Sequence, residues 1–126
     1  MIKNHRHTTR KILMIRPLLS IGLALTMLAT PALAQFKKAI DANIKYDNDV
    51  VMYASKTCSY CKKAEAYFKE QGVNFARVDV DDDEEAASEL ALFGGSSVPV
   101  FVIEGKIYQG FIYSHIDKAL GLNHTD

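Results

Sequence analysis

Two cysteines three positions apart, Cys58 and Cys61, are the residues of this 126-residue chain best suited to chemistry, and they are its only cysteines. A pair at this spacing can cycle between a dithiol and a disulfide, because one helical turn separates the two sulfurs. An apolar, β-prone run at residues 50–53 precedes the pair, and a run with helical periodicity at residues 62–71 follows it. The pair is therefore expected where a strand passes into a helix.

The position of Cys58 at the start of that helix predicts a reactive sulfur. Unpaired backbone N–H groups and the positive end of the helix dipole favour an anion such as a thiolate there. Lys56, Lys62 and Lys63 add positive charge nearby. Cys58 is thus the expected nucleophile, stabilised by Lys56 and the helix terminus, and Cys61, expected to be more buried, would resolve the mixed disulfide.

Two structural roles for the pair are less well supported. A structural zinc site usually has four Cys or His ligands, and none of the histidines makes a metal-spaced pair with the motif. A purely structural disulfide across so short a loop would constrain little of the unfolded chain. A Cys-x-x-Cys beside a strand–helix–strand pattern is instead typical of thioredoxin-like redox chemistry.

Residues 1–34 have the three-part pattern of a secretory signal peptide. Residues 1–16 are basic without an acidic residue, residues 17–28 form an apolar run, and an Ala-x-Ala site ends at Ala34. An uncleaved membrane anchor is the alternative, but the run is short for a span of about 20 residues. We predict cleavage, a periplasmic or secreted protein that starts at Gln35, and no stable membrane insertion afterwards.

Residues 35–126 are expected to form one small domain. This part keeps 10 Lys/Arg against 15 Asp/Glu, a net charge of about −5, which disfavours a nucleic-acid partner. Export would place the cysteines in an oxidising compartment, where a pair at this spacing suits a catalyst of thiol-disulfide exchange.

The hydrophobic pattern predicts a helix followed by the order β-α-β-α-β-β-α. The expected helices lie at residues 35–47, 58–71, 82–93 and 114–120, and the expected strands at residues 50–53, 74–80, 98–103 and 107–109. The acidic run at residues 81–85 is interpreted as a helix start with Asp82 as N-cap, rather than as a docking patch for a basic partner. The order predicts an α/β fold, a small four-stranded mixed sheet flanked by helices.

Several short stretches, considered together, point to a known family. They are Tyr53, Thr57-Cys58-Ser59-Tyr60-Cys61, Val98-Pro99 and Gly110, with a characteristic spacing between the cysteine pair and Val98-Pro99. On these residues the chain from Val50 to Leu120 resembles a glutaredoxin, a member of the thioredoxin fold. The resemblance implies a thiol-disulfide oxidoreductase with glutathione as a candidate co-substrate. It also implies a cis-Pro99 that faces the disulfide and leaves the backbone of Val98 free to pair with an extended substrate.

Three departures from the family pattern bear on substrate choice. Ser59 stands where glutaredoxins usually have proline, and Ser55 where a lysine is frequent, with Lys56 one place late. Residues 109–113 lack the acidic residues that hold the amino end of glutathione in the family. We therefore expect weak glutathione recognition, with substrate contacts from Lys56, Tyr60, Val98, Pro99 and Gly110.

An apolar rim follows Gly110, consisting of Phe111, Ile112 and Tyr113. It suits an unfolded or protein substrate, or it serves as ordinary packing for the last helix. The sequence leaves these two interpretations open.

Two functions from different classes follow. The first is an exported, monomeric thiol-disulfide oxidoreductase without a resident cofactor, which acts on protein disulfides and exchanges electrons with a donor or acceptor of a disulfide relay. The alternative is a non-catalytic thioredoxin-fold module that holds a metal, a [2Fe–2S] cluster or an unfolded chain. Ser59 is the reason to consider a cluster, because some glutaredoxin-like proteins with serine there bind one between two monomers with glutathione. An oxidising compartment disfavours exposed thiolate-held clusters, and reduction is the favoured direction for the enzyme.

Overall fold

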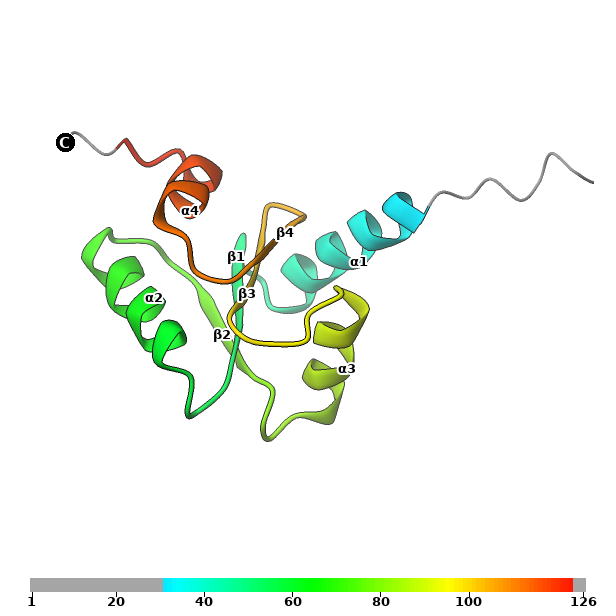
Figure 1. Cartoon of the computed structure of the whole chain (residues 1–126). Helices are drawn as coiled ribbons and strands as arrows, with labels where there is room; N and C mark the ends of the chain where they lie inside the picture. Colours follow the sequence, from blue (N-terminus) through cyan, green and yellow to red (C-terminus); the bar gives the residue numbers. More distant parts are fainter. Residues whose placement is uncertain (1–30, 124–126) are drawn as a thin grey trace, which may run out of the picture. The chain divides into compact units, whose positions relative to one another are not determined.

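The structure, a computed structural model, describes residues 31–123, which form a four-stranded sheet with two helices on each face (Figure 1). The elements are α1 (Pro31–Lys45), β1 (Val50–Ala54), α2 (Ser59–Glu70), β2 (Ala76–Asp79), α3 (Glu84–Leu92), β3 (Val100–Ile103), β4 (Lys106–Gln109) and α4 (Tyr113–Leu120). The strand order is β2-β1-β3-β4; β1 runs parallel to β2 and antiparallel to β3, and β4 runs antiparallel to β3. The predicted α/β fold with a mixed sheet is confirmed. Among the helices of this part of the chain, none is long and apolar enough to cross a bilayer.

Strand β1 separates two hydrophobic cores. Val51 and Tyr53 belong to the core beneath α1 and α3, whereas Val50, Met52 and Ala54 belong to the core beneath α2 and α4. All five residues are buried, so the strand is apolar at every position rather than at alternate ones. This double burial holds the carboxyl end of β1 firmly, and the cysteine pair follows directly from that end.

Tyr53 also anchors α3 and α1 through its hydroxyl group. It donates to Glu89 Oε2 at 2.6 Å, and Glu89 accepts further hydrogen bonds from Tyr46 Oη at 3.1 Å and Lys45 Nζ at 2.6 Å. Burial acts to raise the pKa of the Glu89 carboxyl, but these three donors outweigh it and hold that pKa below its ordinary value. The polar end of an otherwise buried tyrosine is thereby satisfied at the boundary of three elements.

Helix α3 begins one residue later than the sequence predicts. Asp83, rather than Asp82, is the N-cap, and its Oδ1 accepts the N–H groups of Glu85 at 2.9 Å and Ala86 at 3.1 Å. Asp82 pairs instead with Lys56 Nζ at 2.5 Å. The prediction of a helix start in the acidic run is confirmed, but the assignment of the cap was wrong, because consecutive aspartates have the same capping chemistry.

Replacing Asp83 with alanine is expected to lower the free energy of unfolding by about 1 kcal/mol, because two backbone N–H groups would lose their acceptor. Asp82→Ala is the matched control and should leave stability unchanged within experimental error, since its ion pair with Lys56 is exposed on both sides. Urea unfolding followed by circular dichroism would measure both values. Equal losses for the two variants would contradict the assignment of Asp83 as the cap.

Candidate active site

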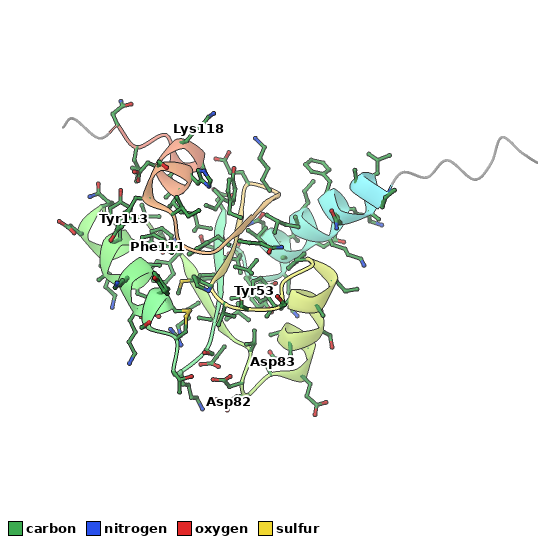
Figure 2. The ribbon with its side chains drawn as sticks, in the orientation of Figure 1. Tyr53, Asp82, Asp83, Phe111, Tyr113 and Lys118 are labelled. Atoms are coloured by element: carbon green, nitrogen blue, oxygen red, sulfur yellow. A yellow bond between two sulfur atoms is a disulfide. The ribbon has the colours of Figure 1, made fainter. Side chains whose placement is uncertain are left out.

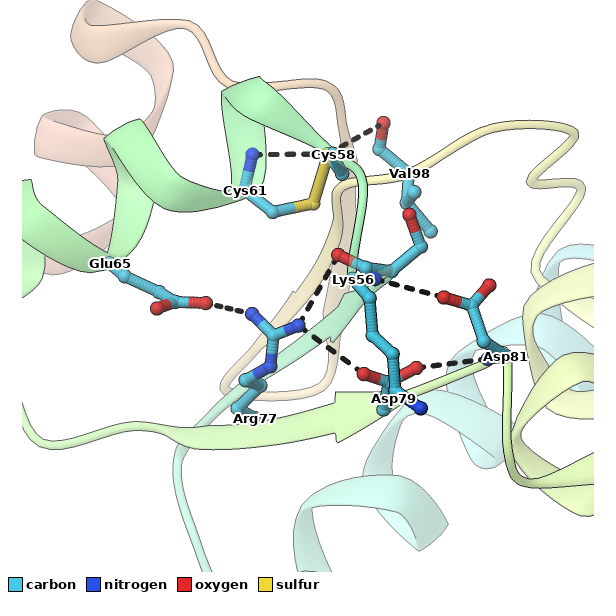
Figure 3. The surroundings of a disulfide bond; sticks show 9 residues. Lys56, Cys58, Cys61, Glu65, Arg77, Asp79, Asp81 and Val98 are labelled. Atoms are coloured by element: carbon cyan, nitrogen blue, oxygen red, sulfur yellow. Dashed lines mark hydrogen bonds and ion pairs between the residues drawn. A yellow bond between two sulfur atoms is a disulfide. The ribbon is translucent and has the colours of Figure 1, made fainter.

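Cys58 and Cys61 form a disulfide where β1 passes into α2 (Figure 3). Cys58 is the N-cap residue of α2, and its Sγ accepts the backbone N–H of Cys61 at 3.1 Å. The Cα atoms of the pair are 5.2 Å apart. Cys58 is half-buried, whereas Cys61 is fully buried. Solvent, and any incoming sulfur, therefore reaches the pair on the Cys58 side.

The start of α2 offers a donor to a charged sulfur. The first N–H groups of a helix have no partner within the helix, and here the N–H of Cys61 is directed at Sγ of Cys58. A thiolate formed at Cys58 on reduction could keep this hydrogen bond, which would then be charge-assisted. The helix dipole acts in the same sense.

The loop before β3 borders the disulfide. The Val98–Pro99 peptide bond is cis, as the resemblance to glutaredoxins implies. The carbonyl oxygen of Val98 lies 3.7 Å from Cys58 Sγ, a van der Waals contact, since a disulfide sulfur carries no proton to donate. The carbonyl of Pro99 accepts the N–H of Gly110 at 2.9 Å, and Gly110 has a φ of 74°, a conformation that favours glycine. The structure thus brings Val98, Pro99 and Gly110 together beside Cys58.

Lys56 does not lie beside the sulfurs. Its side chain points away from the disulfide and pairs with Asp82, while its backbone N–H donates to Asp81 Oδ2 at 2.9 Å (Figure 3). The Asp82 carboxylate raises the pKa of Lys56. In the disulfide form Lys56 is thus engaged by Asp82. Stabilisation of the thiolate by Lys56 and by the helix terminus stays a prediction, as does a contact between Lys56 and substrate.

Arg77 is a residue of this region that sequence reasoning missed. Its guanidinium joins three segments: it pairs with Glu65 of α2 through Nη1, and Nη2 contacts Asp79 Oδ2 at 3.4 Å and the carbonyl of Ser55 at 3.3 Å (Figure 3). Arg77 thus positions the loop before Cys58 against α2 and β2. The sequence does not indicate this role, because Arg77 approaches the loop before Cys58 only once β1 and β2 pair and place Arg77 opposite Met52.

The apolar rim is partly packed and partly exposed. The ring of Phe111 lies 6.2 Å from that of Phe101 and 5.8 Å from that of Tyr67, so Phe111 serves the core beneath α4. Tyr113 packs edge-to-face against Phe111, with ring centres 4.6 Å apart (Figure 2), and against Tyr67 at 5.0 Å. Tyr113 is nevertheless 50% exposed, and Ile112 is 48% exposed. Phe111 therefore serves as packing for the last helix, whereas Ile112 and Tyr113 leave apolar surface open to a substrate.

Tyr60 projects from the first turn of α2 and is 58% exposed. Lys63 Nζ lies 5.1 Å from the centre of its ring, within reach of a cation–π contact. Its exposure beside the cysteines is compatible with the predicted substrate contact, which stays a prediction.

Other parts of the surface offer less to a chemical reaction. Residues 31–123 contain no group of three or more His, Cys, Asp or Glu side chains placed to hold a metal ion. A cavity of about 720 Å³ opens at the amino end of β1, lined by Val50, Asn74 and Gly105 among others. That end of β1 is opposite to the one that leads into Cys58, so this cavity is not part of the disulfide site.

Comparisons with known proteins agree with this geometry. A glutaredoxin family model matches residues 50–108. An uncharacterized glutaredoxin-like 8.6 kDa protein in a rubredoxin operon of Clostridium pasteurianum is 38% identical over 72 residues, 56% of this chain and 96% of the relative. The N-acetyl-S-hydroxy-L-cysteine reductase of Bacillus subtilis (strain 168) is 36% identical over 82 residues, 61% of this chain and 87% of the relative.

The solved structures add agreement in the backbone. The crystal structure of a glutaredoxin from Archaeoglobus fulgidus matches with a TM-score of 0.50 and 28% identity, covering 57% of this chain and 85% of that one. Sequence identity over nearly the whole length of a relative, the match to the family model and the shared fold lead to one assignment. This chain belongs to the glutaredoxin family.

Proposed function

We propose that this protein is an exported thiol-disulfide oxidoreductase that reduces protein disulfides through Cys58 and Cys61. The observation that carries the proposal is the asymmetry of the pair: Cys58 is partly open at a helix N-terminus and accepts a backbone N–H, whereas Cys61 is fully buried behind it. An open, anion-stabilised sulfur is suited to attack, and a covered sulfur three residues away is suited to resolve the adduct.

The reaction needs only the two sulfurs and a source of electrons. The Cys58 thiolate attacks one sulfur of a substrate disulfide, and the other substrate sulfur leaves as a thiolate that takes up a proton. Cys61 then gives up its proton and attacks Sγ of Cys58, which forms the intramolecular disulfide and releases the second substrate sulfur as a thiol. Two electrons have passed from the protein to its substrate, so an external dithiol donor must restore the reduced pair.

The direction of exchange is proposed from the relatives. The Bacillus subtilis relative is named as a reductase of an S-hydroxy cysteine derivative, a compound with an oxidised sulfur. Glutaredoxins as a family act on disulfides or glutathione adducts. Reduction is therefore the direction that we propose, with the protein working as a monomer and without a resident cofactor.

The direct test is insulin reduction by purified protein supplied with a strong dithiol. Wild-type protein is expected to reduce the insulin disulfides faster than the dithiol alone, because Cys58 is presented as an activated nucleophile. Turbidity from the released B chain measures the rate. A wild-type rate no higher than that of the dithiol alone would contradict the proposed function.

Export predicts a mature N-terminus at Gln35. The side chains of residues 31–34, the first turn of α1, are all exposed, so cleavage after Ala34 would remove no buried side chain. Mass spectrometry of an extracytoplasmic fraction should find a chain that begins at Gln35. A full-length chain in the cytoplasm would contradict both the location and the argument from an oxidising compartment.

A further inference from the structure

We infer that Arg77 is a positioning residue for the reactive sulfur: its guanidinium fixes the peptide unit after Ser55 and so holds Cys58 in the orientation that exchange requires. The inference rests on the proposed function, which makes Cys58 the attacking sulfur. It deepens that function, because it names a side chain on a neighbouring strand that prepares the sulfur for attack. Arg77 acts through the backbone, and the chemistry stays with Cys58 and Cys61.

The peptide unit between Ser55 and Lys56 is held at both of its polar ends. Its carbonyl oxygen accepts a hydrogen bond from Arg77 Nη2 at 3.3 Å, and its N–H donates to Asp81 Oδ2 at 2.9 Å (Figure 3). Both partners come from β2 and the loop that follows it. A rotation of this peptide plane would therefore break a hydrogen bond at each end, so the turn that leads into Cys58 has a fixed starting point.

The same carbonyl oxygen also receives the backbone of Cys58. The N–H of Cys58 donates to the carbonyl of Ser55 at 3.4 Å, so this oxygen accepts both from Arg77 and from the residue that carries the nucleophilic sulfur. Cys58 has the extended backbone angles of an N-cap residue, with φ −78° and ψ 107°. This conformation places its Sγ to accept the N–H of Cys61. Arg77 and the sulfur are thus linked through one shared acceptor.

The guanidinium is tied to α2 as well as to the turn. Nη1 pairs with Glu65, which lies about one helical turn beyond Cys61 (Figure 3). Nη2 also contacts Asp79 Oδ2 at 3.4 Å. The side chains of Arg77, Glu65 and Asp79 are 32%, 22% and 25% exposed, so solvent screens these contacts less than those of a fully exposed ion pair. Arg77 therefore fixes the start of α2, whose N–H points at Sγ, relative to the turn that carries Sγ.

The shape of the guanidinium, and not only its charge, suits this role. A planar guanidinium carries its donors on separate nitrogens, so Nη1 can serve Glu65 while Nη2 serves the carbonyl of Ser55. The ammonium of a lysine is a single nitrogen on a flexible stem, and it cannot bridge acceptors on two different segments in the same way. Arg77→Lys therefore keeps the positive charge on β2 but removes the bridge between the turn and α2.

Charges of both signs surround the turn, so positioning must be separated from electrostatics. They come from the loop before Cys58, from α2, from β2 and from the loop after β2: Lys56, Lys62, Lys63, Glu65, Arg77, Asp79, Asp81 and Asp82. Residues 93–103, which include the cis-proline loop, carry no charge. If charge alone mattered, removing the carboxylate of Glu65 would favour a thiolate at Cys58. If positioning matters, the same change disfavours it, so the sign of the effect decides.

The experiment follows alkylation of the reduced protein by iodoacetamide against pH, with mass spectrometry to identify the modified cysteine. The midpoint of the Cys58 profile is the pH at which half of this sulfur is thiolate. Arg77→Lys and Glu65→Ala are each expected to raise this midpoint by about one pH unit, because each breaks the bridge between the turn and α2. Glu70→Ala removes the same charge from the last residue of α2 and is the matched control, with an unchanged midpoint. Urea unfolding checks that each variant is folded.

The opposite results would reject the inference. A wild-type midpoint in Arg77→Lys, or an unchanged or lower midpoint in Glu65→Ala, would show that Arg77 does not position the sulfur. An equal rise in Glu70→Ala would overturn the inference as well, since that residue lies at the far end of α2. Either test variant decides alone if the other does not fold. These results leave the proposed function standing while the wild type reduces insulin, whereas a wild type that does not reduce insulin would reject the proposed function itself.

Discussion

Cys61→Ser protein is expected to accumulate as covalent adducts with its substrates, held through a disulfide from Cys58. The first step of exchange needs only the Cys58 thiolate at the start of α2, which the substitution leaves in place. The second step needs a thiol at position 61, so the mixed disulfide can no longer be resolved within the protein. Non-reducing electrophoresis followed by mass spectrometry would detect the adducts, which should disappear on addition of a strong dithiol.

Cys58→Ser is the control that separates the two sulfurs. Cys61 has no exposed surface, so it should not substitute as nucleophile, and this variant is expected to form no adducts and to reduce insulin no faster than the dithiol alone. Adducts formed by Cys58→Ser but not by Cys61→Ser would mean that the roles are reversed. A Cys61→Ser protein that traps nothing, in an extract where its substrates are present, would favour a non-catalytic binding module instead.

The fold and the reactive pair could be predicted because their signals are local. Strand β1 is apolar at every position, which indicates burial on both faces, and the cysteines follow it at the first turn of a clearly periodic helix. The cis bond before Pro99 was expected only from the resemblance, since nothing in the local sequence favours cis over trans at a single proline. The core contacts of β1 then follow from the alternation of its side chains.

The electrostatics of the site could not be predicted because they depend on strand pairing. The carboxyl ends of β1 and β2 meet at one edge, with Ala54 opposite Asp79, and this brings the acidic loop after β2 to Lys56. Charge counting along the sequence assigned that lysine to the thiolate, since it is two residues from Cys58. In the structure Lys56 pairs with Asp82 at 2.5 Å and Arg77 donates to the carbonyl of Ser55, so both side chains hold the loop before Cys58.

Glutathione is expected to be a poor co-substrate for this member of the family. Residues 109–113 provide no carboxylate for the glutathione amino group, and the lysine that would meet a glutathione carboxylate is shifted to Lys56, which is paired with Asp82. Each charge-assisted hydrogen bond contributes about 1.5–3 kcal/mol, so losing two should lower kcat/KM by about a hundredfold or more. The protein should therefore reduce insulin with a dithiol but show little activity in a glutathione-coupled mixed-disulfide assay.

A single charge placed on the rim tests the physical reason for this weakness. Ile112→Asp puts a carboxylate two residues after Gly110, and Ile112→Asn has nearly the same shape without the charge; both side chains can cap α4, which Ile112 does not. If the missing acid is the cause, the aspartate variant should gain about tenfold over the asparagine variant in the glutathione-coupled assay, as expected for one restored charge-assisted bond. Equal activity of the two variants would show that the acid is not the limiting feature. Efficient removal of glutathione from mixed disulfides by the wild type, saturating at low glutathione, would overturn the prediction and indicate a conventional glutathione-dependent member of the family.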